Sequence, residues 1–202
     1  MDLPRTNSQA HIGPLHDNTV QHHSNEALRE SEERFEAAVK AVQGILWTNN
    51  ARGEMEGAQP EWQALTGQTP QEYQGYGWAK AVHPEDAQPT IEAWNEAVSE
   101  RKTFEFEHRL LTKQNGWRLF AIKAVPLFNP DASIREWVGV HTDITDKRKA
   151  ENTIRESDER FRLMADASPL MIWTLDASGN STYYNKKAID FTGHTENELV
   201  MD

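Results

Sequence analysis

The sequence contains an internal repeat with an offset of 126 residues. Of the 45 residues from 28 to 72, 15 are identical to the residue 126 positions further along, whereas ordinary composition gives about 6% identity by chance. Matching pairs include Glu33-Arg34-Phe35 with Glu159-Arg160-Phe161 and Trp47-Thr48 with Trp173-Thr174. A gapless repeat of this length indicates two copies of one structural unit.

The repeat predicts one complete domain followed by part of a second. A length of 202 residues corresponds to one or two domains. We expect the complete domain at residues 43–146 and an incomplete second domain at residues 165–202. A piece as short as the second rarely folds alone, so we expect either a longer parent protein with tandem units or a fragment that borrows a partner surface.

Composition excludes several classes of function. The chain has 32 Asp and Glu against 21 Lys and Arg, a formal net charge of -11, which repels nucleic-acid phosphates and anionic membranes. We therefore expect no nucleic-acid partner. The absence of Cys excludes a disulfide framework, a thiolate metal site and a cysteine nucleophile, and also a photoreceptor that forms a cysteinyl-flavin adduct.

Hydropathy predicts no direct membrane insertion. No apolar run approaches the roughly 20 residues that cross a bilayer, and the N-terminus lacks the profile of a signal peptide. A cytoplasmic location is the default expectation, and membrane spans of a larger parent would lie outside this sequence.

The N-terminal part divides into a tail and a helix. Residues 1–24 are polar with few large aliphatics, which predicts a disordered tail in which His22 and His23 are solvated. Residues 25–42 form a predicted amphipathic helix, because apolar side chains recur at steps of three and four. The expected dimer seam of this helix is Leu28, Phe35 and Val42.

Short helices follow a first hairpin. Gly44 to Thr48 reads as a strand, and Asn49 to Gly53 as a turn. A helix from Pro60 to Leu65 should end at Gly67, a second should open with a capping box of Thr69 and Glu72, and Asp86 is a candidate N-cap for a third that runs to about Glu100.

After Arg101 the hydrophobic period falls from 3.6 to 2. Phe104 to Leu110 alternates apolar and charged residues, which is typical of a half-buried antiparallel strand. Two more strands are expected at Trp117 to Leu127 and Ile134 to Ile144. Strands at both ends with short helices between them predict an α+β fold.

In order and spacing, these segments resemble the PAS family with its C-terminal PAC motif, of the type found in bacterial sensor histidine kinases. The resemblance spans roughly residues 28–148 and begins again at residue 154. It implies a five-stranded antiparallel sheet with short helices on one face around a small cavity, flanked by amphipathic helices. The carriers are Gly44-Ile45-Leu46-Trp47-Thr48, Trp62 with Leu65-Thr66-Gly67, Trp78 with Val82-His83-Pro84-Glu85-Asp86, Phe104 to Leu110, Val125-Pro126-Leu127, and Trp137 to Thr145.

The resemblance also implies that Asp143, Ile144 and Thr145 join the sheet to a signalling helix. Thr145 is a good N-cap residue, which supports this junction independently. The linker helix is expected at residues 147–164, where Ala150, Ile154 and Phe161 continue the three-four spacing of a parallel dimer seam. The alternative is a helix that packs on its own domain.

Aromatic residues of the predicted domain supply a candidate ligand pocket, which could hold a small apolar ligand. The alternative is that these side chains only fill the core. Haem is disfavoured because the long helix from Pro89 to Glu100 lacks a His, flavin has no specific support, and the cofactor stays unknown. The candidates are Trp47, Trp62, Leu65, Trp78, Phe106, His108 and Leu119.

No metal site and no catalytic centre are expected. His83 lies near Glu85 and Asp86, but helix-start chemistry explains this cluster better than a metal does. We expect a homodimeric sensory module that relays ligand or partner binding to an output domain, as in a histidine kinase. The alternatives are a haem- or flavin-loaded gas or light sensor and a purely structural dimerisation module.

Overall fold

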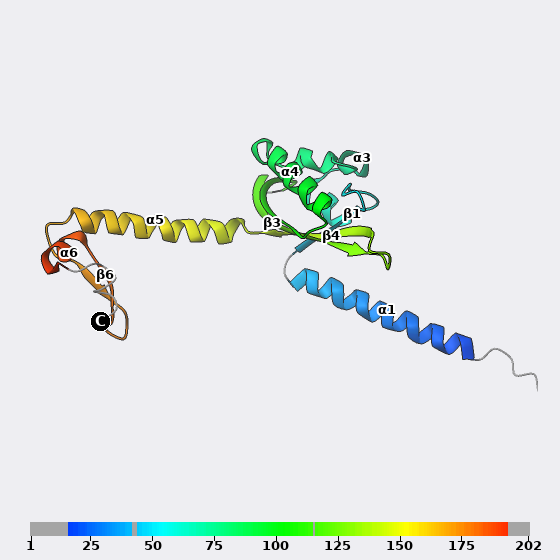
Figure 1. Cartoon of the computed structure of the whole chain (residues 1–202), viewed down its shortest axis with the longest axis horizontal. Helices are drawn as coiled ribbons and strands as arrows, with labels where there is room; N and C mark the ends of the chain where they lie inside the picture. The colour runs from blue at the N-terminus through cyan, green and yellow to red at the C-terminus, as the bar shows by residue number, and fades with distance from the viewer. Residues whose placement is uncertain (1–15, 42–43, 115, 194–202) are drawn as a thin grey trace, which may run out of the picture. The chain divides into compact units, whose positions relative to one another are not determined.

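The computed structural model describes residues 16–41, 44–114 and 116–193 (Figure 1). These divide into two compact units between Asp143 and Ile144, close to the boundary at residue 146 that the sequence predicted. The expected seam residue Val42 lies outside the described residues, as do residues 1–15 of the expected tail.

The first unit has an α+β architecture, which confirms the predicted fold class. Three short helical segments and one longer helix lie between the first strand and the other three. In Figure 1 α3 and α4 lie over one face of the curved sheet. The elements are α1 (His16–Ala41), β1 (Gly44–Asn50), α2 (Pro60–Thr66), α3 (Pro70–Tyr73), the 3-10 helix η1 (Gly77–Ala81), α4 (Pro84–Glu100), β2 (Phe104–Thr112), β3 (Gly116–Phe128) and β4 (Ile134–Asp143).

The sheet of the first unit is antiparallel with the order β1-β4-β3-β2. The first and last strands of the unit therefore pair, with Trp47 opposite Gly139, while β2 and β3 form a long hairpin in which His108 lies opposite Phe120. This register brings the ends of the unit together and places even-numbered residues of β2 and β3 on the covered face.

The predicted fifth strand is wrong for the part of the chain that the structure describes, where four strands form the sheet. Met55 makes isolated bridges to Asn49 and Gly75, and this is all that remains of the partner strand expected after the first turn. Gly57 turns the chain with a φ of +72°, and α2 begins at Pro60. A turn and a helix start so close together leave no room for a longer ladder.

The end of α2 and the start of α3 lie where the sequence predicted them. Gly67 closes α2 in the left-handed conformation with a φ of +79°, which a residue without Cβ adopts at little cost. The carboxylate of Glu72 accepts hydrogen bonds from both the backbone N–H and the hydroxyl of Thr69.

The expected N-cap of α4 is wrong. His83 precedes the helix, and its Nδ1 accepts a hydrogen bond from the N–H of Glu85, with Pro84 in the first turn. Asp86 is instead bound to Arg109 of β2. The carboxylate binds Arg109, which is distant in the sequence, and therefore does not cap the helix as the local sequence predicted.

Aromatic side chains dominate the core between the helices and the sheet. The ring of Trp94 from α4 packs edge-on against Trp47, Phe104 and Trp137, with centroid distances of 5.7, 5.1 and 5.0 Å. Edge-to-face pairs of this kind add to the free energy gained from area burial. One indole of α4 thereby contacts rings from β1, β2 and β4.

The second unit reproduces the start of the first at the same offset. Its elements are α5 (Thr145–Ala167), β5 (Trp173–Leu175), β6 (Ser181–Tyr184) and α6 (Lys186–Thr192), with β5 and β6 antiparallel. The ends of α1 and α5, and both bounds of α2 and α6, differ by 126 residues. Gly193 closes α6 with a φ of +73°, as Gly67 closes α2. The sequence repeat is thus also a repeat of secondary structure.

The flanking helices are longer than predicted. The helix α1 begins at His16, so residues 16–24 are helical and the expected disordered tail is wrong there, while α5 spans Thr145–Ala167 in place of residues 147–164. Apolar spacing locates a seam but not the ends of a helix, because each added residue gains a backbone hydrogen bond whatever its polarity. Within the described ranges, no helix has the length and hydropathy needed to cross a bilayer.

Candidate functional site

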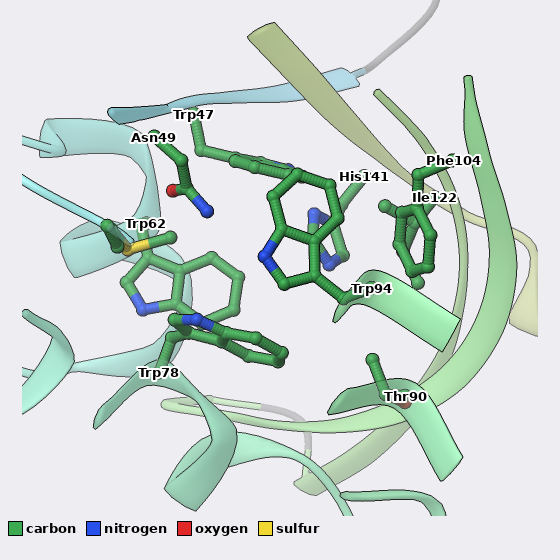
Figure 2. A pocket seen from close by; sticks show the side chains of 10 residues that line it. Trp47, Asn49, Trp62, Trp78, Thr90, Trp94, Phe104, Ile122 and His141 are labelled. Carbon is green, nitrogen blue, oxygen red and sulfur yellow. The ribbon is translucent and has the colours of Figure 1, made fainter. Parts of the chain in front are cut away.

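A small cavity lies between the helices and the covered face of the first sheet (Figure 2). Its volume is about 20 Å³. Side chains from seven of the elements and from the Met55 bridge converge on it. The lining residues are Trp47, Asn49, Met55, Trp62, Trp78, Thr90, Trp94, Phe104, Ile122 and His141.

Three of the seven predicted pocket residues line this cavity, namely Trp47, Trp62 and Trp78. Leu65 and Phe106 are partly buried and pack against the core, but they do not line the cavity. His108 is buried behind His141.

Leu119 does not line the cavity, because its strand position has the wrong parity. In β3 Phe120 and Ile122 are buried on the covered face, and successive strand residues point to opposite faces. Leu119 therefore belongs to the outer face. Both faces of this strand carry apolar residues, so the sequence pattern did not show which face is buried.

Seven lining residues were missed by the sequence reasoning. Strand alternation was a usable signal for Phe104, Ile122 and His141. Each lies an even number of residues from another buried residue of its own strand, and therefore on the same face of the sheet. Thr90 and Trp94 are four residues apart on one helix face, which helical spacing could have paired. Asn49 has the parity of Trp47 in β1, which continues two residues beyond the predicted strand end at Thr48. The bridge at Met55 had no local signal. The seven are Asn49, Met55, Thr90, Trp94, Phe104, Ile122 and His141.

The volume of the cavity limits what it holds in this conformation. A cavity needs about 10–15 Å³ to admit one water molecule, so about 20 Å³ suits a molecule of that size. A haem or a flavin would require the surrounding indoles to move apart. The aromatic residues therefore fill most of the core and leave one small gap between them, whose wall is almost entirely apolar.

Two buried imidazoles stand at the sheet side of the cavity. The Nε2 atoms of His108 and His141 are 3.2 Å apart, and Nδ1 of His108 is 3.2 Å from Oγ1 of Thr90. Burial lowers the pKa of His108 to about 4, and burial together with the neighbouring His108 lowers the pKa of His141 well below its usual value. Both rings are therefore neutral at physiological pH.

Four polar atoms of lining residues have no hydrogen-bond partner within the part of the chain that the structure describes. Two are indole N–H donors, one is an amide oxygen, and one is an imidazole nitrogen. Buried polar groups nearly always have a partner in protein or ordered water, so these four atoms are exceptions among the buried polar groups of the domain. The four atoms are Nε1 of Trp47, Nε1 of Trp78, Oδ1 of Asn49 and Nδ1 of His141.

An ion pair beside the cavity joins α4 to β2. Both carboxylate oxygens of Asp86 accept hydrogen bonds from the guanidinium of Arg109, at 2.8 and 2.7 Å, and one also accepts the backbone N–H of Arg109 at 2.9 Å. These bonds lower the pKa of Asp86 to about 2. This cluster is structural, and no group of three or more His, Cys, Asp or Glu side chains among the described residues has the arrangement of a metal site.

The predicted junction residues lie where the first unit ends and the second begins. Asp143 is the last residue of β4 and forms an ion pair with Arg118 of β3. Ile144 takes the N-cap position of α5 without a side-chain cap bond, and Thr145 is the first residue of the helix, one position later than expected for a cap. One residue therefore separates the strand from the helix.

The predicted seam residues on the two flanking helices are largely exposed in the single chain. Leu28 and Phe35 on α1 are 59% and 50% exposed, and Ile154 on α5 is 71% exposed. Ala150 is exposed too. Phe161 is 40% exposed, and its ring also packs edge-on against Tyr183 in the same unit at a centroid distance of 5.3 Å.

Comparison with known proteins identifies the first unit. The family described as the PAS fold matches residues 56–141. These residues form a PAS domain. The cavity, with its walls of α4 and the antiparallel sheet, is thus the interior of a PAS domain.

Named relatives include sensor proteins. The chain is 32% identical over 174 residues to the uncharacterized protein y4lL of Sinorhizobium fredii, covering 86% of this chain and 21% of that protein. It is 29% identical over 130 residues to the two-component sensor PprA of Pseudomonas aeruginosa, covering 63% of this chain and 14% of PprA. The chain thus spans about a fifth or less of these relatives.

Among solved structures, a sensory box histidine kinase/response regulator from Burkholderia thailandensis is 26% identical with a TM-score of 0.48, covering 64% of this chain and 98% of that one.

Proposed function

We propose that this chain is a sensory and dimerisation segment, in which the occupancy of the PAS cavity changes the pairing of α5 with α5 of a second copy. The observation that carries the proposal is the direct connection of sheet and helix. The cavity residue His141 is in β4, the strand that ends at Asp143, and α5 begins at Thr145. A change in the strand is therefore delivered to the helix through one residue.

Dimerisation is supported by the spacing of exposed apolar residues. Ala150, Ile154 and Phe161 follow steps of four and seven on α5, and Leu28 and Phe35 are seven apart on α1. Repeats at three, four and seven residues place side chains on one stripe of a helix, the seam that two-stranded coiled coils bury. Two alternative helix registers then supply the two states that a ligand shifts.

The output is proposed from the named relatives. Because PprA is named as a two-component sensor, we propose that the parent protein of this chain is a sensor histidine kinase, with the second unit as the start of a further PAS domain. The repeat of α2 and its glycine cap in α6 and Gly193 supports this assignment.

Sedimentation of the full chain at several concentrations tests the dimer. We expect a reversible dimer for the unmodified chain and a monomer for Ile154→Glu, because a carboxylate would be buried in an apolar seam. Arg155→Glu is the matched control, since it places the same side chain one position away from the stripe and should leave the dimer intact. A strict monomer at all concentrations, or equal effects of the two substitutions, would contradict the proposal.

A further inference from the structure

One buried side chain of the second unit joins the end of one helix to the start of the next. Asn185 is completely buried, and its amide nitrogen donates to the carbonyl oxygens of Ala165 and Leu170 at 2.7 and 2.9 Å. Its amide oxygen accepts the N–H groups of Ile172 and Ala188 at 2.9 and 3.1 Å. These four bonds use both hydrogens and both lone pairs of the amide. Asn185 is therefore fixed where the last turn of α5, the segment before β5 and the first turn of α6 meet.

A carboxylate of α5 makes a second connection at the same place. Oδ1 of Asp166 accepts the backbone N–H of Lys186 at 2.7 Å and the hydroxyl of Tyr183 at 3.2 Å. The last carbonyl groups of a helix and the first N–H groups of another lack partners within their own helices. Asp166 and Asn185, here called the clamp, thus bind residues 183–188 to the end of α5.

The clamp lies beside the point at which the apolar stripe of α5 changes partner. The ring of Tyr183 contacts Phe161, and the guanidinium of Arg162 lies 5.1 Å from its centroid. Ile154, seven residues before Phe161, is instead 71% exposed. Helix residues seven apart lie on one stripe, so the first part of the stripe is open and the last part is used within the chain. A second α5 packed on Phe161 would compete with Tyr183 for that ring.

The first unit has different residues at the two clamp positions. The residue 126 positions before Asn185 is Gln59. Its amide oxygen accepts the N–H of Thr48 at 3.1 Å, and its amide nitrogen donates to the carbonyl of Thr48 at 2.8 Å, so both ends of this longer side chain bind β1. The residue 126 positions before Asp166 is Lys40, a residue type that cannot accept hydrogen bonds. The two copies therefore differ where the clamp is made.

We propose that Asp166 and Asn185 lock the last turn of α5 to β6 and α6, so that a rotation of α5 carries these elements with it and the seam between two α5 helices ends before Phe161. The second consequence rests on the dimer of the proposed function. The lock itself lies within one chain, and it is measured without reference to the dimer.

Amide hydrogen exchange of the full chain tests the lock. Asp166→Ala removes an acceptor of the clamp, and Asn185→Gln places the side chain of the first copy in the second. We expect each substitution to raise exchange about tenfold at Ile172, at Lys186 and in residues 164–167 together, because amides that open in one cooperative step exchange together. Unchanged exchange at these amides in both variants would overturn the proposal.

Asp176→Ala is the matched control within the same unit. Asp176 accepts the N–H groups of Ser178 and Asn180 between β5 and β6, at 2.8 and 2.9 Å. Its loss should raise exchange in that turn and leave residues 164–167 unchanged. Equal effects of Asp176→Ala and Asp166→Ala on α5 would contradict the lock. Asp166→Ala decides the question if Asn185→Gln unfolds the second unit, because it keeps the buried amide.

Disulfide trapping measures where the seam ends. The chain has no Cys, so Ser157→Cys and Met164→Cys each introduce a single thiol, seven residues apart on the stripe. A disulfide needs close Cα atoms, so we expect Ser157→Cys to trap a dimer about tenfold faster than Met164→Cys. Adding Asp166→Ala should raise the rate at Met164→Cys toward that at Ser157→Cys.

The outcomes of trapping separate the two proposals. Equal rates at the two positions with the clamp intact would overturn the predicted end of the seam. Trapping at neither position would refute the dimer of the proposed function alone, and hydrogen exchange at Lys186 would then decide the lock.

Discussion

The Nε2 atoms of His108 and His141 face each other at 3.2 Å across two strands that are not neighbours in the sheet. Both rings are almost completely buried, and β3 with Phe120 and Ile122 lies between their strands. A protonated imidazole in this place would lose its hydration and repel its neighbour. The pair is therefore stable only as two neutral rings that share one hydrogen bond.

This burial predicts a loss of stability in mild acid. The folded-state pKa of His108 is about 4, below the ordinary value of 6.5, and that of His141 is lowered as well. The unfolded state then binds more protons than the folded state between these values, so the free energy of unfolding falls as pH drops from about 6.5 toward 4. His108 alone contributes about 3 kcal/mol to this loss. Urea unfolding at several pH values in this range measures it.

The matched variant for the pH prediction is the double substitution His108→Gln and His141→Gln. Its stability should be nearly flat across the same range, even if its value at neutral pH is lower. The pKa of Asp86 is lowered from 3.8 to about 2, so its contribution to stability is lost mainly below pH 4 and changes little above that pH. An equal slope in both proteins would show that other groups cause the acid sensitivity.

Asp86→Asn should weaken the attachment of α4 to β2. The substitution keeps the shape but removes the charge that Arg109 binds with two guanidinium nitrogens and a backbone N–H. We expect a loss of about 1 kcal/mol, at the low end for a charge-assisted bond, because the pair is partly exposed and screened. Urea unfolding at neutral pH measures the loss, and at high salt the difference between the two proteins should shrink.

Gly139→Ala should destabilise the domain by crowding one indole. A Cβ on Gly139 would lie 2.2 Å from the ring of Trp47 on the paired strand, which is far inside van der Waals contact. Overpacking of a rigid core costs about 1–3 kcal/mol. Thermal unfolding of Gly139→Ala, Trp47→Phe and the double variant measures the coupling, and the smaller phenyl ring should recover most of the loss. Additive losses would contradict this account.

Asp143→Asn should loosen the end of β4. Asp143 forms an ion pair with Arg118 on the neighbouring strand, at the last position before the junction with α5. Removing the charge weakens a pair that is only partly exposed, so amide hydrogen exchange should rise at the end of β4 and in the first turn of α5. The substitution Asp131→Asn in the turn before β4 is a control that should leave these amides unchanged. A change confined to β4 would contradict the proposed relay into α5.

Local sequence patterns predicted the parts that depend on near neighbours. The identity of residues 28–72 with the segment 126 positions later reappears as equal helix ends and equal glycine caps. The capping box of Thr69 and Glu72 formed as its spacing indicated. Each of these features arises from bonds within a few residues, so sequence by itself determined them.

The tertiary structure decided the site. His108 and His141 are 33 residues apart, and Met55 is placed by isolated bridges to Asn49 and Gly75. Leu119 lies on the outer face of β3, which local sequence did not reveal because both faces of that strand carry apolar residues. Asp86 binds Arg109, 23 residues away, and does not occupy the helix cap that local sequence predicted. Which polar atoms are paired, and which are left around a cavity of one molecule, depends on strand register and packing, because those set contacts between segments that no local pattern connects.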